Sequence, residues 1–115
     1  MYQDMDVANY IIELYLDKGK TINIHILQKE LYKANEHYLR HIGASLVVGE
    51  FKNNATNSYL ESVYRNFRHL NNNPIKSVVP YLTMDLDGNL FISDYSNDVL
   101  NKQDRVVLKQ VCCDF

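Results

Sequence analysis

"HILQKELYKANEHYLRHIG", residues 25–43, decides the fold of this chain. Apolar side chains recur through it in alternating steps of three and four residues, which is the period of one helix face. With Asn23 as the N-terminal cap, or Thr21 in its place, and Gly43 as the stop, the stretch predicts a helix of about five turns. We expect this helix to pack against others along its whole length. The apolar seam consists of Ile24, Leu27, Leu31, Ala34, Tyr38 and Ile42.

Two further helices are predicted toward the ends of the chain. The first covers about residues 5–17 and is capped by Asp4 or Asp6, whose carboxylates can accept hydrogen bonds from free N–H groups of the first turn. The last begins after Asn101, its cap, and Asp104 in its first turn complements the helix dipole. The apolar side chains of Val107, Leu108 and Val111 can dock the last helix.

The third helix is predicted over about residues 58–70, after a cap at Asn57 or Ser58. Its inward face is expected to consist of Leu60, Val63, Tyr64 and Phe67. Basic and aromatic side chains on and next to its outer face are the predicted contacts of a protein partner, and the alternative is a solvated face. These candidate partner-binding residues are Tyr59, Arg65, Arg68 and His69.

Two segments predict β-structure. The apolar, β-branched run at residues 44–51 favours a short strand. Residues 81–93 predict a hairpin that turns at Asp87-Gly88, because Asp-Gly tolerates the positive φ of a tight turn. The sequence therefore predicts an α+β, mainly helical fold: one compact domain over residues 1–115, with about four helices and a small β-hairpin.

Composition narrows the class of protein. The chain has 115 residues and a formal net charge of −2, which disfavours nucleic acid as the main partner because such binders need a basic face. The only cysteines, Cys112 and Cys113, are adjacent and have no third cysteine to pair with, which is typical of a reducing, cytoplasmic compartment. No apolar run approaches the ~20 residues that span a bilayer, so we expect no membrane association.

Two histidines raise the question of a metal site. His37 and His41 are one helical turn apart, so both imidazoles can face one Zn²⁺ ion. A catalytic zinc site also needs a third protein ligand and a water, and the HExxH order is not present. A polar helix flank explains the same residues, and we expect no metal and no cofactor.

The segment "DLDGN", residues 85–89, begins like a calcium-binding loop. Such a loop requires Gly at its sixth position and a bidentate Glu at its twelfth, where this chain has Leu90 and Ser96. A hairpin turn explains the same letters. A possible acidic surface consists of Asp85, Asp87, Asp94 and Asp98, with a solvated turn and loop as the alternative.

No catalytic motif stands out. Cys112 and Cys113 would need a neighbouring base or positive charge to be reactive, and packing of the last helix explains them as well. Neither GxGxxG nor GxxxxGK[ST] occurs. We therefore expect a protein that is not an enzyme.

Two motifs near the start of the chain are distinctive: "VANYII" at residues 7–12 and "LQKELY" at residues 27–32. Two later segments follow them, "LESVYRNFRHL" at 60–70 and "LNKQDRVVLKQV" at 100–111. In this order they resemble the Panacea domain, a SocA-like, phage-associated antitoxin family. The Trp and the Gly-Pro-Val segment usual in the family are replaced here by "FKNNATNSYLES". The resemblance implies an antitoxin, which neutralises a toxin by binding it or delivers it to a protease.

From the residues and the resemblance together we expect a non-enzymatic intracellular protein that binds and neutralises a protein partner. One alternative is a phage-encoded inhibitor of a host defence nuclease, of the anti-CRISPR type, that acts by occlusion. An acidic inhibitor of that kind can mimic nucleic acid. A second alternative is a small metal-dependent enzyme that uses His37 and His41.

Overall fold

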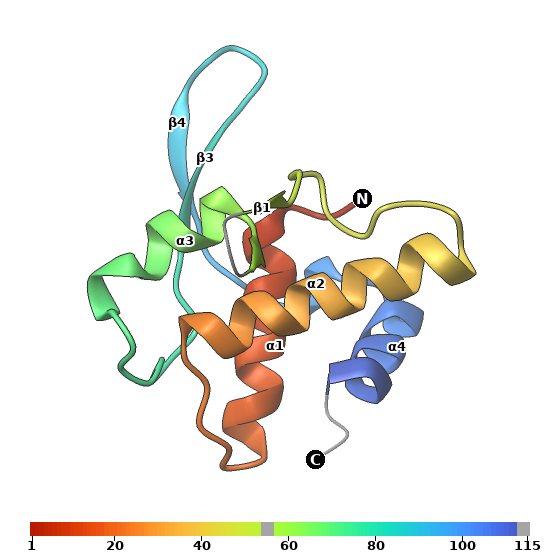
Figure 1. Cartoon of the computed structure of the whole chain (residues 1–115). Coiled ribbons are helices and arrows are strands. Elements are labelled where there is room, and N and C mark those ends of the chain that lie inside the picture. The colour runs from red at the N-terminus through yellow and green to blue at the C-terminus, as the bar shows by residue number, and fades with distance from the viewer. Residues whose placement is uncertain (54–56, 113–115) are drawn as a thin grey trace.

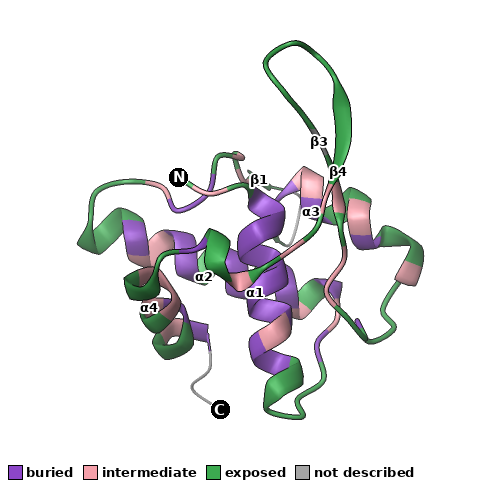
Figure 2. Ribbon diagram, turned by 180° about the vertical axis from the view of Figure 1, so that it is seen from behind, coloured by how far each residue is buried: buried purple, intermediate pink, exposed green. Residues whose placement is uncertain are grey.

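The first helix, α1 (Asp4–Asp17), is buried on nearly all sides. In the computed structural model, which describes residues 1–53 and 57–112, α1 contacts α2 (Ile24–His41), α3 (Glu61–Phe67) and α4 (Lys102–Cys112) (Figure 1). Apolar side chains occur around its whole circumference, which is typical of a helix at the centre of a core. Its burial is visible as an almost continuous purple ribbon in Figure 2.

The predicted central helix is confirmed as α2. The side chain of Asn23, and not that of Thr21, caps it by accepting a hydrogen bond from the N–H group of Ile26 at 2.9 Å. Gly43, with φ of 81°, follows the end of the helix. The predicted seam is buried from Ile24 to Tyr38, but the inclusion of Ile42 was wrong, because it lies just past the last helical residue and is 61% exposed.

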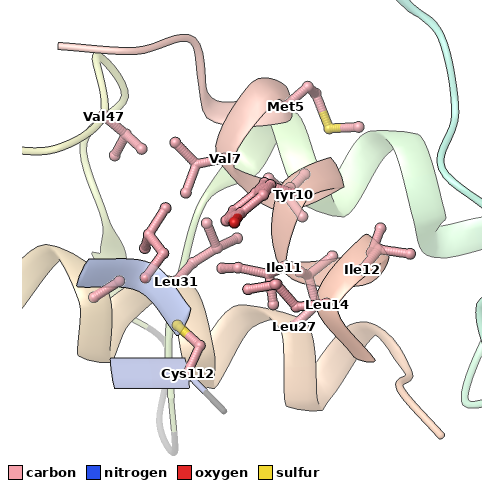
Figure 3. Close-up of a cluster of buried hydrophobic side chains, with 14 of the residues drawn as sticks. Met5, Val7, Tyr10, Ile11, Ile12, Leu14, Leu27, Leu31, Val47 and Cys112 are labelled. Atoms are coloured by element: carbon pink, nitrogen blue, oxygen red, sulfur yellow. The ribbon is translucent and has the colours of Figure 1, made fainter. Parts of the chain in front are cut away.

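The hydrophobic core lies between α1 and α2 and extends to α4 and α3. Val7 and Ile11 of α1 face Leu27 and Leu31 of α2, and Cys112 of α4 is part of the same buried cluster (Figure 3). Burying each such side chain contributes about 1.5–3 kcal/mol. The helices are therefore held together mainly by this apolar contact.

Two buried side-chain amides attach loops to the helices. Asn9 of α1 donates to the carbonyl oxygen of Val79 at 2.8 Å and accepts from its N–H group at 3.0 Å. Gln28 of α2 does the same with Leu60, at 3.1 Å and 3.0 Å. Each amide replaces a backbone partner, so the loop backbone stays hydrogen-bonded where it enters the core.

The strand predicted at residues 44–51 was wrong. Leu46 and Val47 are buried as expected, but within this stretch the only β-pairing is a single parallel bridge between Val47 and Tyr2. The side-chain oxygen of Asn35 accepts from the N–H group of Leu46 at 2.8 Å. The Asn35 side chain in α2 thus supplies a hydrogen-bond acceptor that a neighbouring strand would otherwise provide.

The third helix begins later than predicted. Residues Ser58–Tyr59 form β2, which pairs with β1 (Lys52–Asn53), and α3 starts only at Glu61. Gln28 holds the backbone of Leu60 in an extended conformation, which delays the helix by three residues. A 3₁₀ turn, Arg68–Leu70, follows α3.

The inward face of α3 is shorter than predicted. Leu60, Val63 and Phe67 are buried, as the spacing indicated. The inward placement of Tyr64 was wrong, because its side chain is 44% exposed.

The predicted caps of α1 were also wrong. Gln3 precedes the helix, and its side chain makes no capping bond. Asp4 lies inside the first turn and accepts from the N–H group of Gly49 at 2.8 Å and from the hydroxyl group of Ser62 at 2.6 Å. Asp6 accepts from the hydroxyl group of Tyr81. Both carboxylates therefore join distant segments instead of capping their own helix.

The cap of α4 and the hairpin are confirmed. The side chain of Asn101 accepts from the N–H group of Asp104 at 2.8 Å. Strands β3 (Tyr81–Met84) and β4 (Leu90–Ser93) pair in antiparallel register and project from the helical body (Figures 1 and 2). The mainly helical α+β fold is thus confirmed. None of the helices in the described ranges is both long and apolar enough to cross a membrane.

Candidate protein-binding surfaces

The projecting hairpin, residues 81–93, presents an apolar face to solvent, and we refer to the hairpin as the arm. In an antiparallel ladder, residues directly opposite each other, and those two positions along, lie on the same face. The pairs Leu82–Ile92 and Met84–Leu90 therefore share one face. These four side chains, which we call the apolar arm face, are exposed by 64%, 69%, 61% and 60% respectively.

The root of the arm is fixed to α1. The backbone of Val79, just before β3, is held by both hydrogen bonds of Asn9. Two residues later the hydroxyl group of Tyr81 donates to Oδ1 of Asp6 at 2.9 Å. Burial raises the pKa of the Asp6 carboxyl group, and the hydrogen bond from Tyr81 partly opposes this rise in pKa. Burial and the bond to Asp6 together raise the pKa of Tyr81 to about 12.

The tip of the arm is organised by Asp85. Its Oδ1 atom accepts from the N–H groups of Asp87 and Asn89, both at 2.9 Å. These bonds, with that from Asn89 the largest influence, lower the pKa of the Asp85 carboxyl group below its ordinary value. Gly88 adopts φ of 84°, as the predicted turn requires. Leu86, between the two aspartates, is fully exposed.

The structure does not bring the four predicted acidic residues into one cluster. Asp85 and Asp87 lie in the turn at the tip, whereas Asp94 directly follows β4 at the root. Asp98 lies further along the chain, in the 3₁₀ turn Asn97–Val99, whose Asn97 contacts Glu13 of α1. The four-residue strands place the tip and the root on the order of 13 Å apart along the arm. All four side chains are exposed. Their negative charge therefore lies at both ends of the apolar arm face.

The predicted partner-binding residues lie along α3. Arg65, Arg68 and His69 are exposed, and Tyr59 is half-buried beside Tyr64, with ring centroids 6.2 Å apart. Tyr59 precedes the helix and Arg68 and His69 follow it, so these residues span its whole length of about 10 Å. They line one helix and do not meet at a point.

One arginine of this surface already has a partner within the helix. Nε of Arg65 lies 3.5 Å from Oε1 of Glu61, one turn earlier. The Arg65 and Glu61 side chains are 65% and 35% exposed, and an i, i+4 ion pair on a helix surface contributes only about 0.3–0.5 kcal/mol. The guanidinium group of Arg65 can therefore exchange Glu61 for a carboxylate of a partner at little cost.

A cleft of about 360 Å³ lies beside Tyr59, between the start of α2 and β2. His25, Lys29 and Tyr64 are among its lining residues. Nε2 of His25 is 2.6 Å from the side-chain oxygen of Asn72, which fixes the imidazole at the rim. Local sequence patterns did not predict this cleft, because its walls come from two segments that are distant in the sequence, Ile24 to Lys29 and Asn57 to Tyr64.

The histidine pair lies on the outer flank of α2. The ring centroids of His37 and His41 are 4.4 Å apart. Across residues 1–53 and 57–112, no three or more His, Cys, Asp or Glu side chains are grouped so that they could hold a metal ion. Cys112 is buried in the core, and Cys113 lies outside the described residues.

The comparisons with known proteins add no relative. No protein-family profile matches the chain, and neither a curated protein nor a solved structure matches it. The resemblance to the Panacea domain therefore rests on the quoted residues alone.

Sequence reasoning predicted the hairpin but missed its exposed apolar face. The signal was present in the run 81–93, where apolar residues occupy both sides of the turn at every second position. Such alternation normally indicates a face buried in the domain. Only the projection of the arm from the body shows that this face is unoccupied by the described part of the chain.

Proposed function

We propose that this chain is a non-enzymatic binding protein that neutralises a protein partner by covering its working surface, as an antitoxin does. The apolar arm face is the observation that carries the proposal. Leu82, Met84, Leu90 and Ile92 form a contiguous apolar surface, and such surfaces on single domains mark binding sites. Burying each of these side chains in a partner contributes about 1.5–3 kcal/mol at most.

The resemblance to the Panacea domain supports the antitoxin role. Its two strongest motifs, residues 7–12 and 27–32, fall on α1 and α2, and Val7, Ile11, Leu27 and Leu31 from them are core residues. These two motifs thus concern residues that build the fold. The surface on α3 lies within the third quoted segment, residues 60–70, whereas the arm lies outside the quoted segments.

The outer surface of α3 is proposed as a second contact. Arg65 is exposed on α3, Arg68 and His69 are exposed directly after it, and Tyr59 lies in β2, two residues before the helix. Arginine and tyrosine are favoured in protein interfaces because they combine a large contact area with directional hydrogen bonds. We place the action in the cytoplasm, because the two cysteines are adjacent in sequence and have no third cysteine with which to pair.

A second candidate function is inhibition of a host defence nuclease by a phage protein, of the anti-CRISPR type. The charge of one segment favours it. Residues 77–101 contain four Asp and no Glu, Lys, Arg or His, which gives a local charge of −4. A nuclease binds its substrate through a basic surface, which attracts such a segment.

Co-expression with the neighbouring genes tests the antitoxin function. Each gene adjacent to this one in the source genome is induced alone and together with this chain in a bacterial host. Growth arrest that this chain relieves is the expected result. The control is the same chain with Leu82→Ser and Ile92→Ser, which must fold and fail to relieve the arrest.

The alternative has its own readout. If no neighbour is toxic, the chain is expressed in cells whose CRISPR system excludes a targeted plasmid. Recovery of that plasmid would replace the antitoxin role with the inhibitor role. If neither growth nor plasmid exclusion responds to the chain, the proposed function is wrong.

A further inference from the structure

The charge that borders the apolar arm face has one sign. Asp85 and Asp87 lie at its tip and Asp94 directly follows its root, and residues 77–101 contain no basic residue. The rest of the chain carries 12 Lys and Arg residues, so this segment differs from its surroundings. The arm therefore combines an exposed apolar face with an acidic border.

We infer that the partner presents an apolar surface bordered by lysine or arginine side chains, onto which the arm docks. This inference rests on the proposed function and names the chemistry of the partner. The apolar arm face supplies the buried centre of the interface, and the aspartates at its two ends meet the basic border. This is the usual division of an interface into an apolar core and a polar rim.

A second copy of this chain fits the arm less well. Two apolar arm faces packed together would bring carboxylates of both arms to the edges of one interface. Like charges opposed across an interface cost several kcal/mol. The arm itself, residues 81–93, offers no cation to offset them. Charge complementarity thus favours a basic partner over self-association.

The hydrogen bonds at both ends of the arm prepare it for docking. Asn9 holds Val79 at the root, and Asp85 holds the backbone of Asn89 at the tip. An element ordered before binding loses less conformational entropy when it binds. The arm can therefore dock as a unit, although it contributes one small surface.

Because the area of the arm is small, we expect electrostatic attraction to contribute much of the binding free energy and of the association rate. Four side chains and Leu86 cover less than the roughly 800 Å² that one partner contributes to an interface of standard size. Attraction between the aspartates and a basic border raises the association rate and weakens as salt screens it. We expect binding to fall steeply between low and physiological salt.

Two synthetic peptides serve as probes of this chemistry. One alternates valine with lysine, and its matched control alternates valine with glutamate at the same length. Each is titrated into the full-length ¹⁵N-labelled chain, and amide shifts are followed by NMR. The Val/Lys peptide is expected to shift the amide signals of residues 82–92. Its Kd should be lower than that of the Val/Glu peptide by a factor of about ten or more.

Three variants separate the contributions. Leu82→Ser with Ile92→Ser should abolish binding of the Val/Lys peptide. Asp85→Asn with Asp87→Asn should weaken it and flatten its salt dependence. The matched control is Val99→Ser with Val106→Ser, which changes two apolar side chains outside the arm that are about half exposed and should leave binding unchanged.

Several results would overturn the inference. Equal binding of both peptides removes the charge argument, and binding that survives Leu82→Ser with Ile92→Ser removes the arm. A dimer in analytical ultracentrifugation that the same pair of changes dissociates would assign the apolar arm face to a second copy. The proposed function fails separately, when the chain relieves neither toxicity nor plasmid exclusion although the Val/Lys peptide binds the arm.

Discussion

The hydroxyl group of Tyr38, in α2, donates a 2.5 Å hydrogen bond to Oδ1 of Asp104, in α4, 66 residues later in the chain. The hydroxyl group of Tyr2 donates to the other oxygen of the same carboxylate. One aspartate thus joins the N-terminal segment, α2 and α4. Burial and the neighbouring carboxylate raise the pKa of Tyr38 well above its ordinary value, so the hydroxyl remains a donor throughout the physiological range.

Tyr38→Phe should lower the free energy of unfolding by about 1.5–3 kcal/mol, because it removes a hydrogen bond to a charged acceptor. Urea denaturation followed by circular dichroism measures the change. Tyr32→Phe makes the same chemical change on the exposed side of α2 and should stay within about 0.5 kcal/mol of the wild type. Equal losses in the two variants would contradict a specific role for Asp104.

Gly49→Ala should destabilise the fold by about 1–3 kcal/mol through a steric clash. A Cβ atom at this position would lie 2.8 Å from Cγ of Asp4, and closer still to Oδ2 of that side chain. The carboxylate would have to move away from Ser62, to which it is hydrogen-bonded. Thermal unfolding of both single variants and of Asp4→Ala with Gly49→Ala gives the test. Strict additivity of the two changes would show that no clash occurs.

Tyr81→Phe should raise the pKa of Asp6 further, because the Tyr81 hydroxyl group donates the bond that opposes the effect of burial. A raised pKa means that the ionised carboxylate opposes folding above its folded pKa, and that this opposition disappears below the unfolded value of 3.8. The variant should therefore lose more stability at pH 7 than at pH 3. Carbon-detected NMR titration of Asp6 measures the shift, with Tyr64→Phe as the control on an exposed tyrosine. An unchanged titration would exclude this hydrogen bond in solution.

Acidification should loosen the tip of the arm before its root. The lowered pKa of Asp85 means that its carboxylate stabilises the turn above the unfolded value of 3.8, and that this support is lost as pH falls through the lower folded pKa. The amide signals of Asp87 and Asn89 should shift in that range, whereas that of Val79 should not follow the same titration. Asp85→Ala should reproduce the acidic spectrum of the turn at neutral pH. A turn that is unchanged in this variant would contradict the role given to Asp85.

Arg65→Glu with Arg68→Glu should abolish binding of the protein partner identified in the co-expression test. Both side chains are exposed, and only the weak pair with Glu61 is lost, so stability should change by less than about 1 kcal/mol. Lys18→Glu with Lys109→Glu imposes the same change in charge elsewhere and serves as the control. Isothermal titration calorimetry and a melting curve measure the two quantities. Undiminished binding would remove α3 from the interface and leave the arm.

The features that sequence reasoning predicted correctly are set by neighbouring residues. The cap at Asn23, the apolar seam of α2 and the Asp-Gly turn each depend on fewer than about five consecutive positions or on a regular period. The start of α3 depends instead on Gln28, 32 residues before Leu60. Likewise, the hydrogen bond that Asp4 accepts from Gly49, 45 residues later, could not be predicted from neighbouring residues.

The candidate site follows the same rule. The outward placement of Arg65 and Arg68 follows from helical period, and the structure shows both side chains exposed. The exposure of the arm does not follow from its own residues alone, because its root is attached to α1 by the bonds of Asn9 to Val79 and of Tyr81 to Asp6. These partners lie 70 or more residues apart in the sequence.

The separation of the arm from the core has a consequence for how this protein can change over generations. No side chain of the apolar arm face contributes to the buried core, and the root is held through the backbone of Val79 and through Tyr81. Paired substitutions at 82 with 92, or at 84 with 90, can therefore alter the recognised surface without a loss of folding stability. The surface that we propose for binding can therefore be changed separately from the residues that hold the fold together.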